Sequence, residues 1–529
     1  MEGMRDFVII GAGPSGLQLG YFFQRAGLNH VILEAANRPG NFYGRFPRHR
    51  TLISVNKVYT GYKTQELNLR WDWNALLCDD ERFLFRNYSR AYFPHANDLL
   101  RYLDDFAKHH MLPVRYGARV AQIDRHGDVF EVSDTEGRIE RARCVVVATG
   151  LGLEFIPDVP GIEFAEPYGE VSVDPEDFCG QRVLVLGKGN SAFETADNLV
   201  PTASLIHLVS PSPLQFAWKS HYVGHLRAVN NNFLDTYQLK SQNAVLDARV
   251  AKIEKTGSQY TVSFAYEHAS EEVEEIVYDR IICCTGFRFD TSIFSPACPI
   301  DTAINGRYPD MTASWESTST PGIYFAGVLM HRCDYRRKQS GFIHGFRYNV
   351  RALAGLLQER YAGTPYPRTE IDGTPEGIAT AILEDVNTSS SLWQQSGFLA
   401  SVVVLEDDGT ASYYRDFPVA YAHERFADKS TYFVVTLDFG QERVDQVANV
   451  FAIDRVHKRD VANANLSTAI HPIVRCGRRG RVVATHHVIE DLRSEWYEDY
   501  HRQPLIGFLA GELPGSDCPE VQVPMASAR

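Results

Sequence analysis

A glycine-rich turn near the N-terminus constrains the fold more than any other feature of this 529-residue chain. An apolar run at residues 8–10 breaks directly into the six residues GAGPSG, and a helical pattern follows over residues 17–26. In a strand–turn–helix unit, the first glycine permits the tight turn and the second lets the backbone approach a pyrophosphate. The third lets the helix pack closely on the strand, while the helix N-terminus favours the anion. The turn predicts a dinucleotide site formed by Gly11, Gly13, Pro14, Ser15 and Gly16.

An acidic residue stands where such a unit contacts the adenosine ribose. The next strand, at residues 31–33, ends in Glu34, which lies 18 residues beyond Gly16. A carboxylate at this spacing can accept hydrogen bonds from the ribose hydroxyls. This context favours dinucleotide binding over the alternative, a glycine turn of purely structural use.

A second strand–turn–helix signal begins near residue 182. Residues 182–186 form an apolar run that leads into GKGNSA, with alanine at the third glycine position, which the motif permits. The segment predicts a second dinucleotide site at Gly187, Gly189, Asn190, Ser191 and Ala192.

Two further apolar runs end in a Thr-Gly pair. Residues 144–147 lead into one pair and residues 280–284 into the other, while residues 322–327 resemble the late strand that returns to the ribityl side of a flavin. We expect these chain ends to lie at the carboxyl edges of parallel sheets, where cofactors bind in such folds. The contacts predicted there are Ala148, Thr149, Gly150, Thr285, Gly286 and Gly327.

The order of these motifs predicts nested domains. We predict an α/β fold with two three-layer Rossmann-type domains, one for FAD at residues 1–164 and 316–365 and one for NAD(P)H at residues 165–315. Hydride transfer needs the two rings face to face, which explains paired nucleotide folds in one chain. After a Pro-rich linker, strand-like runs predict an α+β accessory domain at residues 370–529, which could support a homodimer, cap the cleft or hold a partner.

Composition and charge narrow the class of protein. The chain has 53 basic and 66 acidic residues, a net charge of -13, and lacks the clustered basic surplus of a nucleic-acid binder. No run of 18 apolar residues predicts a membrane span, and a strand begins too early for a signal peptide. We therefore expect a cytoplasmic protein with neither nucleic acid nor membrane as a partner.

Cysteine and histidine patterns do not favour a redox dithiol or a metal site. The nine cysteines form no CxxC motif, and the adjacent pair Cys283 and Cys284 sits in an apolar run typical of buried cysteines. His486 and His487 are adjacent on a predicted strand and would face opposite ways, so we predict no metal.

These motifs together resemble the flavin-containing monooxygenases and their Baeyer–Villiger and N-hydroxylating relatives, over roughly residues 5–365. A closer resemblance is to a family of eukaryotic FAD-dependent oxidoreductase domain-containing proteins linked to endoplasmic-reticulum degradation. The segments that carry the closer resemblance are FPRHR at 46–50, YSRAYFP at 88–94, SVDPEDF at 172–178, DTYQLK at 235–240 and GFIHGFRY at 341–348. One departure stands out: the monooxygenase fingerprint expects a His and an aromatic residue four positions later, whereas residues 168–172 read YGEVS.

The resemblance implies roles for two residues near the flavin. Asn56 matches an asparagine that helps hold the C4a-hydroperoxide in the monooxygenases, with an ordinary turn asparagine as the alternative. Lys57 would hold a substrate anion or simply be a solvated loop residue. A helix start aimed at the pyrimidine end of the flavin would stabilise negative charge on the reduced ring. We therefore predict flavin contacts at Gln339, Ser340 and Gly341.

The coenzyme and the substrate are less constrained. Residues 208–213 carry serines where an arginine would meet the 2′-phosphate, although Lys219 or Arg227 could reach it. The family resemblance favours NADPH over NADH. Tyr62, Trp71 and Trp73 are candidate pocket residues, although aromatic residues at such spacing usually belong to a core.

Three functions fit these motifs. The first is a monooxygenase that takes hydride from NADPH or NADH, activates O2 as the flavin C4a-hydroperoxide and oxygenates a nitrogen, sulfur or carbonyl centre of a small molecule, including amine N-hydroxylation. The second is a reductase or oxidase without oxygen insertion. The third is a flavin-bound redox sensor or assembly factor.

Overall fold

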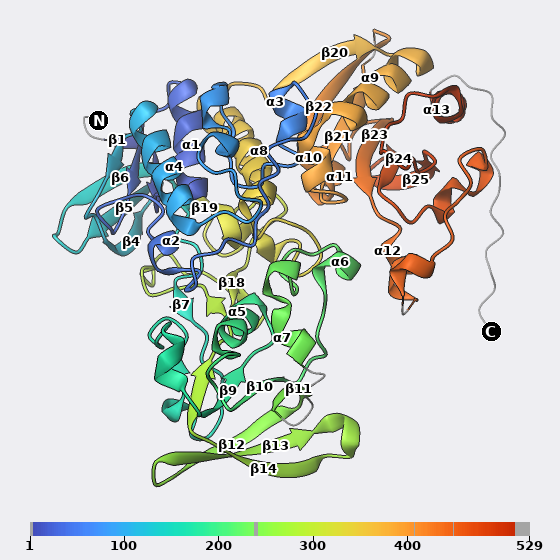
Figure 1. The fold of residues 1–529 in the computed structure, drawn as a ribbon. Coiled ribbons are helices and arrows are strands. Elements are labelled where there is room, and N and C mark those ends of the chain that lie inside the picture. Colours follow the sequence, from blue (N-terminus) through green and yellow to red (C-terminus); the bar gives the residue numbers. More distant parts are fainter. Residues whose placement is uncertain (1–3, 237–241, 407, 448, 514–529) are drawn as a thin grey trace, which may run out of the picture. The chain divides into compact units, whose positions relative to one another are not determined.

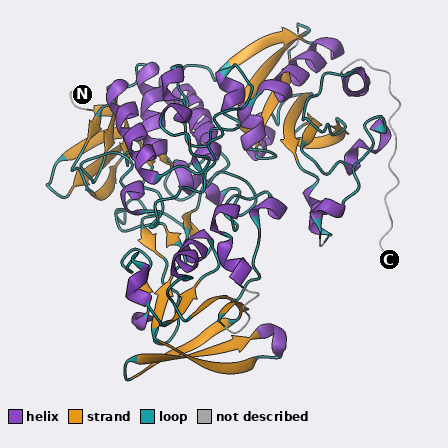
Figure 2. Cartoon of the chain, viewed as in Figure 1, coloured by secondary structure: helices purple, strands orange, loops and turns teal. Residues whose placement is uncertain are grey.

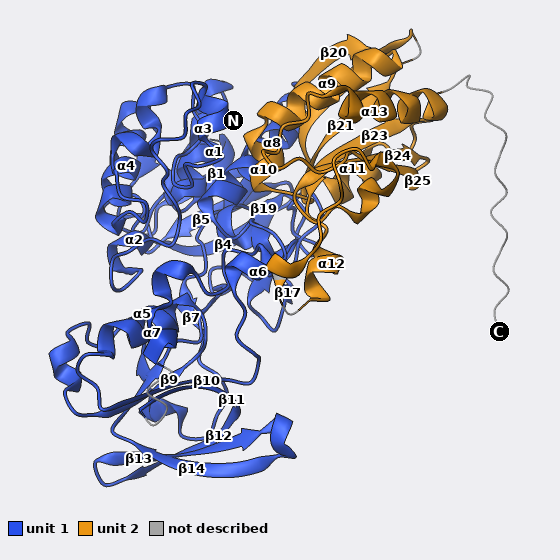
Figure 3. Cartoon of the chain, turned by 45° about the vertical axis from the view of Figure 1, so that its right-hand side comes forward, with its two compact units in different colours: residues 1–365 blue, residues 366–529 orange. Residues whose placement is uncertain are grey.

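The computed structural model describes residues 4–236, 242–406, 408–447 and 449–513 (Figure 1). Part of the DTYQLK segment, residues 237–240, therefore lies outside the described residues. The chain divides into two compact units, residues 1–365 and residues 366–529 (Figure 3). The fold is mixed α/β, as the sequence predicts, with parallel Rossmann-type sheets in the first unit and an antiparallel sheet in the second.

The N-terminal sheet of the first unit has seven strands in the order β3-β2-β1-β6-β5-β4, with β19 also paired to β6. Its central strands pair in parallel, and their side chains are buried on both faces, as expected where helices cover both sides. The strands are β1 (Met4–Ile10), β2 (His30–Leu33), β3 (Val114–Arg115), β4 (Val120–His126), β5 (Val129–Asp134), β6 (Ile139–Val147) and β19 (Ile323–Phe325).

Long helices flank this sheet (Figure 2). They are α1 (Pro14–Arg25), α4 (Ala96–His109) and α8 (Ile343–Ala362). The buried Gln18 amide connects α1 to two other segments, because it donates to the Arg347 carbonyl at 2.5 Å and accepts from the Leu77 N–H at 2.8 Å. The polar bridge connects α1 to α8 and to the segment that contains Leu77.

The second sheet of this unit has the order β11-β10-β9-β15-β8, with all pairs parallel. Its strands are β8 (Glu166–Pro167), β9 (Arg182–Leu186), β10 (Leu205–Ser210), β11 (Asn243–Asp247) and β15 (Arg280–Cys283), and α5 (Asn190–Leu199) follows β9. An antiparallel sheet adjoins it, formed by β12 (Arg249–Thr256), β13 (Gln259–Tyr266) and β14 (Glu272–Tyr278) (Figure 1). The two predicted glycine turns therefore each connect a central parallel strand to a helix.

Short elements connect these layers. The helices are α2 (Phe42–Arg45), α3 (Gln65–Asn68), α6 (Ala217–Ser220) and α7 (Asn232–Asp235), and the strands are β7 (Leu153–Glu154), β16 (Phe287–Arg288), β17 (Thr302–Ala303) and β18 (Tyr308–Pro309). A 3₁₀ helix, η8 (Gly327–Arg332), follows β19 and leads toward α8.

The second unit is built on a six-stranded antiparallel sheet in the order β20-β22-β21-β23-β24-β25. The strands predicted at residues 399–405 and 432–437 are present as β21 and β23. The bounds are β20 (Arg368–Asp372), β21 (Leu399–Leu405), β22 (Thr410–Pro418), β23 (Tyr432–Asp438), β24 (His471–Arg478), β25 (Arg481–His487), α9 (Pro375–Thr388), α10 (Ser390–Gln394), α11 (Val419–Arg425), α12 (Gln441–Asp445) and α13 (Asp499–Glu512). Apolar residues of α9 and α13 share one core with β21, β23 and β24.

The adjacent histidines of β25 have separate surroundings. The His487 ring nitrogen Nδ1 lies 2.9 Å from Nε2 of His471, whereas the His486 ring stacks on Phe508. Burial lowers the pKa of His486 and of His487 to about 4, so both rings are neutral at physiological pH. Within the described ranges, no group of three or more potential ligands could hold a metal ion. No helix in the same ranges is long and apolar enough to cross a membrane.

Candidate functional site

The first glycine turn leaves open space in front of α1. Gly11 has φ +106°, and a Cβ atom there would lie 2.6 Å from the Ala148 carbonyl oxygen, while a Cβ at Gly16 would overlap the Gly11 carbonyl. Gly13 differs, because it caps α1 with an ordinary φ of -72° and a Cβ placed there would meet no atom within 4 Å. The turn thus fits a pyrophosphate, which needs close backbone approach at a helix N-terminus.

Glu34 is tied to this turn by its carboxylate. The side chain is buried and accepts hydrogen bonds from the Ala12 N–H at 2.7 Å and the Ala36 N–H at 2.9 Å. A carboxylate has about four acceptor positions, so these two bonds leave capacity for ribose hydroxyls. Contact with the ribose stays a prediction.

Three chain segments converge at the carboxyl ends of β1, β6 and β19. A Cβ atom added to Gly150, which belongs to the Thr-Gly pair after β6, would lie 3.8 Å from the Val328 side chain. A Cβ atom added to Gly327 would overlap the Ser15 hydroxyl. Thr149 lies between the buried Ala148 and this glycine. The structure thus brings the first glycine turn, the first Thr-Gly pair and the start of η8 to one edge of the sheet, as the motif order predicts.

The second glycine turn repeats this geometry. Gly187 has φ +126°, and a Cβ there would overlap the Cys284 carbonyl, whereas Gly189 caps α5 and a Cβ on it would meet no atom within 4 Å. Ser191 and Ala192 follow in the first turn of α5, where Ala192 is buried. At the same carboxyl edge, after β15, the Thr285 hydroxyl donates to the Phe155 carbonyl and Gly286 has φ +89°.

Asn190 has a role that the sequence motif does not reveal. Its amide nitrogen donates to the carbonyls of Gly224 at 3.2 Å and His225 at 2.9 Å, and its Oδ1 accepts from the Arg227 N–H at 3.0 Å. Its Oδ1 also accepts from the Asn230 amide at 3.2 Å, so four hydrogen bonds of one side chain fix the loop at residues 221–230 beside the glycine turn. The side chain is therefore used within the protein, which leaves the backbone of Asn190 for the predicted coenzyme contact.

Asn56 and Lys57 differ sharply in environment. Asn56 is 1% exposed, and its amide nitrogen donates to the carbonyls of Ser89 at 2.8 Å and Ala91 at 3.3 Å. Its Oδ1 is buried with no hydrogen-bond partner within the described ranges, which makes it a candidate acceptor for a bound group. Lys57 is exposed, with Nζ 6.0 Å from the Trp71 ring centroid, so it fits a solvated loop better than a buried anion site.

The predicted flavin contacts at the start of α8 already hold other parts of the protein. Gln339 donates to the His221 carbonyl at 2.5 Å and accepts from the Val223 N–H at 3.5 Å. The Ser340 hydroxyl is buried and accepts from the Asn349 amide at 2.8 Å. Gly341 packs against the imidazole ring of His331. Backbone groups of this segment therefore remain the candidates for flavin binding.

A buried Asp–His–Tyr chain, which was not predicted from the sequence, lies beside this segment. Nδ1 of His331 lies 2.8 Å from an Asp334 carboxylate oxygen. Nε2 accepts from the Arg336 N–H at 3.2 Å, so the ring proton belongs on Nδ1, and the Tyr222 hydroxyl at 3.0 Å donates to Nε2. Burial raises the pKa of Tyr222. The chain connects the loop held by Asn190 to the end of η8.

The YGEVS segment at residues 168–172, which departs from the monooxygenase fingerprint, contacts residues of both nucleotide-binding halves. Tyr168 stacks on Phe46, and its hydroxyl donates to the buried carboxylate of Glu194. Nearby, the Arg48 guanidinium donates to the Val171 carbonyl at 2.7 Å. Burial raises the pKa of Glu194 to about 7, although the Tyr168 hydrogen bond opposes the shift.

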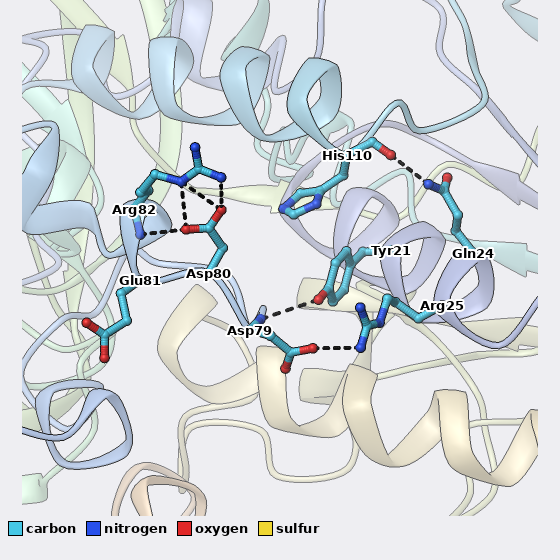
Figure 4. Close-up of a pocket in the computed structure, with 8 residues that line it drawn as sticks. All are labelled: Tyr21, Gln24, Arg25, Asp79, Asp80, Glu81, Arg82 and His110. Atoms are coloured by element: carbon cyan, nitrogen blue, oxygen red, sulfur yellow. Dashed lines mark hydrogen bonds and ion pairs between the residues drawn. The ribbon is translucent and has the colours of Figure 1, made fainter.

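Two cavities lie at the opposite end of α1 from the glycine turn. They have volumes of about 440 and 450 Å³ and share Tyr21, Arg25 and Asp79. In the first cavity, Arg25 pairs with Asp79 at 2.9 Å, so the charges are internally matched (Figure 4). The 12-residue helix is about 18 Å long, which separates these cavities from the turn. They are not the predicted dinucleotide site.

Comparison with known proteins agrees with this geometry. Residues 8–327 match the model of the pyridine nucleotide-disulphide oxidoreductases. The chain belongs to this family. It is 38% identical to the FAD-dependent oxidoreductase domain-containing protein 2 of Mus musculus, over 96% of this chain and 83% of the mouse protein. The resemblance seen in the sequence is thereby confirmed.

More distant relatives span several activities. The senecionine N-oxygenase of Tyria jacobaeae is 26% identical over 60% of this chain and 66% of its own length. The structure of the bacillithiol disulfide reductase Bdr from Staphylococcus aureus superposes with a TM-score of 0.51 at 18% identity, over 68% of this chain and 99% of that one. The protein is an FAD-dependent oxidoreductase from a family that includes monooxygenases and reductases.

Gly13→Asp tests the first glycine turn. We expect this variant to fold normally, because the Cβ position is open and φ is ordinary, but to lose FAD through repulsion of the pyrophosphate. Like-charge juxtaposition costs several kcal/mol, so FAD affinity should fall by about 100-fold or more. Flavin absorbance per protein measures occupancy, and circular dichroism measures folding. Gly152→Asp, also in open space, is the matched control, and equal FAD content in both variants would contradict the assignment.

Glu194→Gln tests the buried carboxyl group. The folded-state pKa of about 7 lies above the ordinary 4.5, so ionisation of Glu194 destabilises the fold as pH rises through this window. The glutamine variant should gain on the order of 2 kcal/mol in unfolding free energy relative to the parent at pH 8, and about nothing at pH 4.5. Urea unfolding at both pH values measures the difference. The exposed Glu170→Gln variant should show no such pH dependence, and a pH-independent effect of Glu194→Gln would refute the prediction.

Proposed function

We propose that this protein is an NADPH-dependent monooxygenase that uses FAD and O2 to oxygenate a nitrogen, sulfur or carbonyl centre of a small molecule. The observation that carries the proposal is the buried Asn56 amide, whose nitrogen is held by two carbonyls while its oxygen has no partner in the part of the chain that the structure describes. Such an amide offers a fixed polar contact in a water-poor site. The similarity to an N-oxygenase makes amine oxygenation one version of the proposal.

The described side chains would contribute binding and orientation. Bound FAD would accept hydride from the nicotinamide and supply the oxygen chemistry. Asn190 fixes the loop at residues 221–230 on the coenzyme side, and Gln339 fastens that loop to the segment before α8. The Tyr222–His331 hydrogen bond adds a second connection. These contacts support a face-to-face arrangement of the two cofactors.

A lysine in the second glycine turn supports NADPH as the coenzyme. Lys188 is 4% exposed in its side chain and pairs with Asp247 at the end of β11. Because β10 lies between β9 and β11, the lysine side chain crosses the carboxyl end of β10, where Ser210 ends the strand. That edge is where a Rossmann fold contacts the 2′ position of the adenosine ribose. A cation and a hydroxyl there suit a 2′-phosphate.

The second candidate is a reductase or oxidase without oxygen insertion. The YGEVS segment at residues 168–172 favours this candidate, because it departs from the monooxygenase fingerprint. Its Tyr168 hydroxyl donates a hydrogen bond to Glu194. Disulfide reduction through Cys283 and Cys284 fits poorly, because burial raises the pKa of both thiols and no CxxC motif exists in the chain.

One experiment separates the two candidates. The FAD-loaded protein is reduced anaerobically with NADPH or NADH, then supplied with O2 and a panel of amines, sulfides and ketones. We expect flavin reduction by NADPH and a product that has gained one oxygen atom, detected by mass spectrometry. Stoichiometric hydrogen peroxide without any oxygenated product would favour the oxidase, and no flavin reduction by either coenzyme would reject both candidates.

Lys188→Met tests coenzyme choice, because methionine removes the charge and keeps most of the apolar stem of the side chain. Loss of a charge-assisted bond of about 1.5–3 kcal/mol should raise the KM for NADPH by about 10- to 100-fold and leave the KM for NADH nearly unchanged. Asp247→Asn should lower the KM for NADPH, because it removes a carboxylate that competes for the lysine. Lys252→Met, at an exposed pair, is the control. Equal changes for both coenzymes in Lys188→Met would contradict this role.

A further inference from the structure

A buried histidine at the start of α8 has no hydrogen-bond partner for either ring nitrogen among the residues that the structure describes. His344 is 1% exposed, and its ring stacks on Trp73 with centroids 4.2 Å apart and an interplanar angle of 25°. Phe342 lies on a nearly parallel plane, 5.9 Å from His344. Burial, followed by the neighbouring Arg347 and Arg227, lowers the pKa of His344 well below its ordinary value. The ring is therefore neutral and offers one N–H donor and one acceptor that no described residue uses.

An arginine without a counter-ion lies beside the same stack. The Arg227 guanidinium carbon is 5.2 Å from the Trp73 ring centroid, and burial lowers the pKa of Arg227. Among the residues that the structure describes, no carboxylate pairs with it. The backbone N–H of Arg227 is held by Asn190, so the position of this residue is fixed from the second glycine turn.

The neighbouring Arg347 shows what a structural buried arginine looks like in the same region. Its guanidinium donates to the carbonyls of Asp72, Ala75 and Leu69 and to the Tyr348 hydroxyl. The buried Asp72 carboxyl group also interacts electrostatically with it. Four hydrogen bonds hold the Arg347 guanidinium, although its Nε has no hydrogen-bond partner among the described residues. Arg227 is half-buried, and its guanidinium lies against the Trp73 ring.

We propose that Arg227 and His344 form a binding site for the carboxylate of a small-molecule substrate. The guanidinium offers a planar fork that matches a carboxylate, and the neutral imidazole adds one N–H donor. The N-terminus of the 20-residue helix α8 favours negative charge at the same place. One uncompensated positive charge matches a monoanion such as a carboxylate better than a phosphate monoester, which carries about -1.5 to -2.

The apolar surroundings define the rest of the ligand. Trp73 and Phe342 present ring surfaces next to the donors, so the carboxylate would belong to a molecule with an apolar or aromatic body. Arg227 comes from the half that carries the second glycine turn, while Trp73 and His344 come from the half that carries the first. This inference rests on the proposed function in one respect, because it names the substrate class of that oxidoreductase site.

Ligand binding to the oxidised, FAD-loaded protein tests the site without requiring turnover. Acetate, benzoate and phenylacetate are titrated against acetamide, benzamide and phenylacetamide, with inorganic phosphate as a further arm, and the change in flavin absorbance reports binding. We expect at least one carboxylate to bind about 10-fold or more tightly than its amide, and more tightly than phosphate. Arg227→Met should abolish this preference, and His344→Phe, which preserves the ring stack, should weaken it.

The controls separate this inference from the proposed function. The exposed Arg249→Met variant, from the same half of the unit, should bind carboxylates like the parent. Carboxylate selectivity that persists although NADPH fails to reduce the flavin would support the site and reject the proposed function. Equal binding of carboxylates and amides, or preferential binding of phosphate, would overturn the inference. An increase in the KM for NADPH in Arg227→Met as large as its loss of carboxylate affinity would also overturn it, because Arg227 would then hold the coenzyme.

Discussion

The Asn190 carboxamide is the interaction on which the arrangement of the candidate site depends. It satisfies two carbonyls and one N–H of the loop at residues 221–230, and it does so from the first turn of the helix that follows the second glycine turn. That loop carries Tyr222 toward His331 and Arg227 toward Trp73. The Asn190 side chain thus connects the second glycine turn to Tyr222 and Arg227, which contact the half of the unit that carries the first glycine turn. An aspartate would retain the acceptor but lose both donated bonds.

The parts of the fold that could be predicted from sequence are those encoded by local pattern. The turns at Gly11 and Gly187 need positive φ and close backbone approach, which only glycine tolerates, so their signal survives in the sequence. The strands β21 and β23 were predictable because each is a continuous apolar run bounded by turn residues. In each case the physical requirement is met by a few neighbouring residues.

The Asp–His–Tyr chain could not be predicted in the same way. Tyr222 and His331 are separated by 109 residues, and each residue alone is compatible with an ordinary core position. The spacing of His331 and Asp334 is a weak signal, because helical turns place many such pairs together. Asn190 and Gln339 show the converse: their types and positions suggested cofactor contacts, yet their side chains hold the loop at residues 221–230. Sequence shows that a polar group is present, whereas only the fold shows which partner uses it.

The contrast between the buried Arg347 and the half-buried Arg227 connects structure to function. Four hydrogen bonds hold the Arg347 guanidinium, and its charge is opposed by the buried Asp72 carboxyl group, so removing either partner would leave a costly unpaired group. Among the described residues no carboxylate compensates Arg227, and the Trp73 ring that it contacts also stacks on the imidazole of His344, whose nitrogens have no partner in that part of the chain. Stability alone gives no reason to keep a desolvated cation and an unsatisfied imidazole together at a helix N-terminus. A ligand that brings the missing negative charge removes both penalties at once, which is why unsatisfied groups are a better guide to a binding site here than cavity volume.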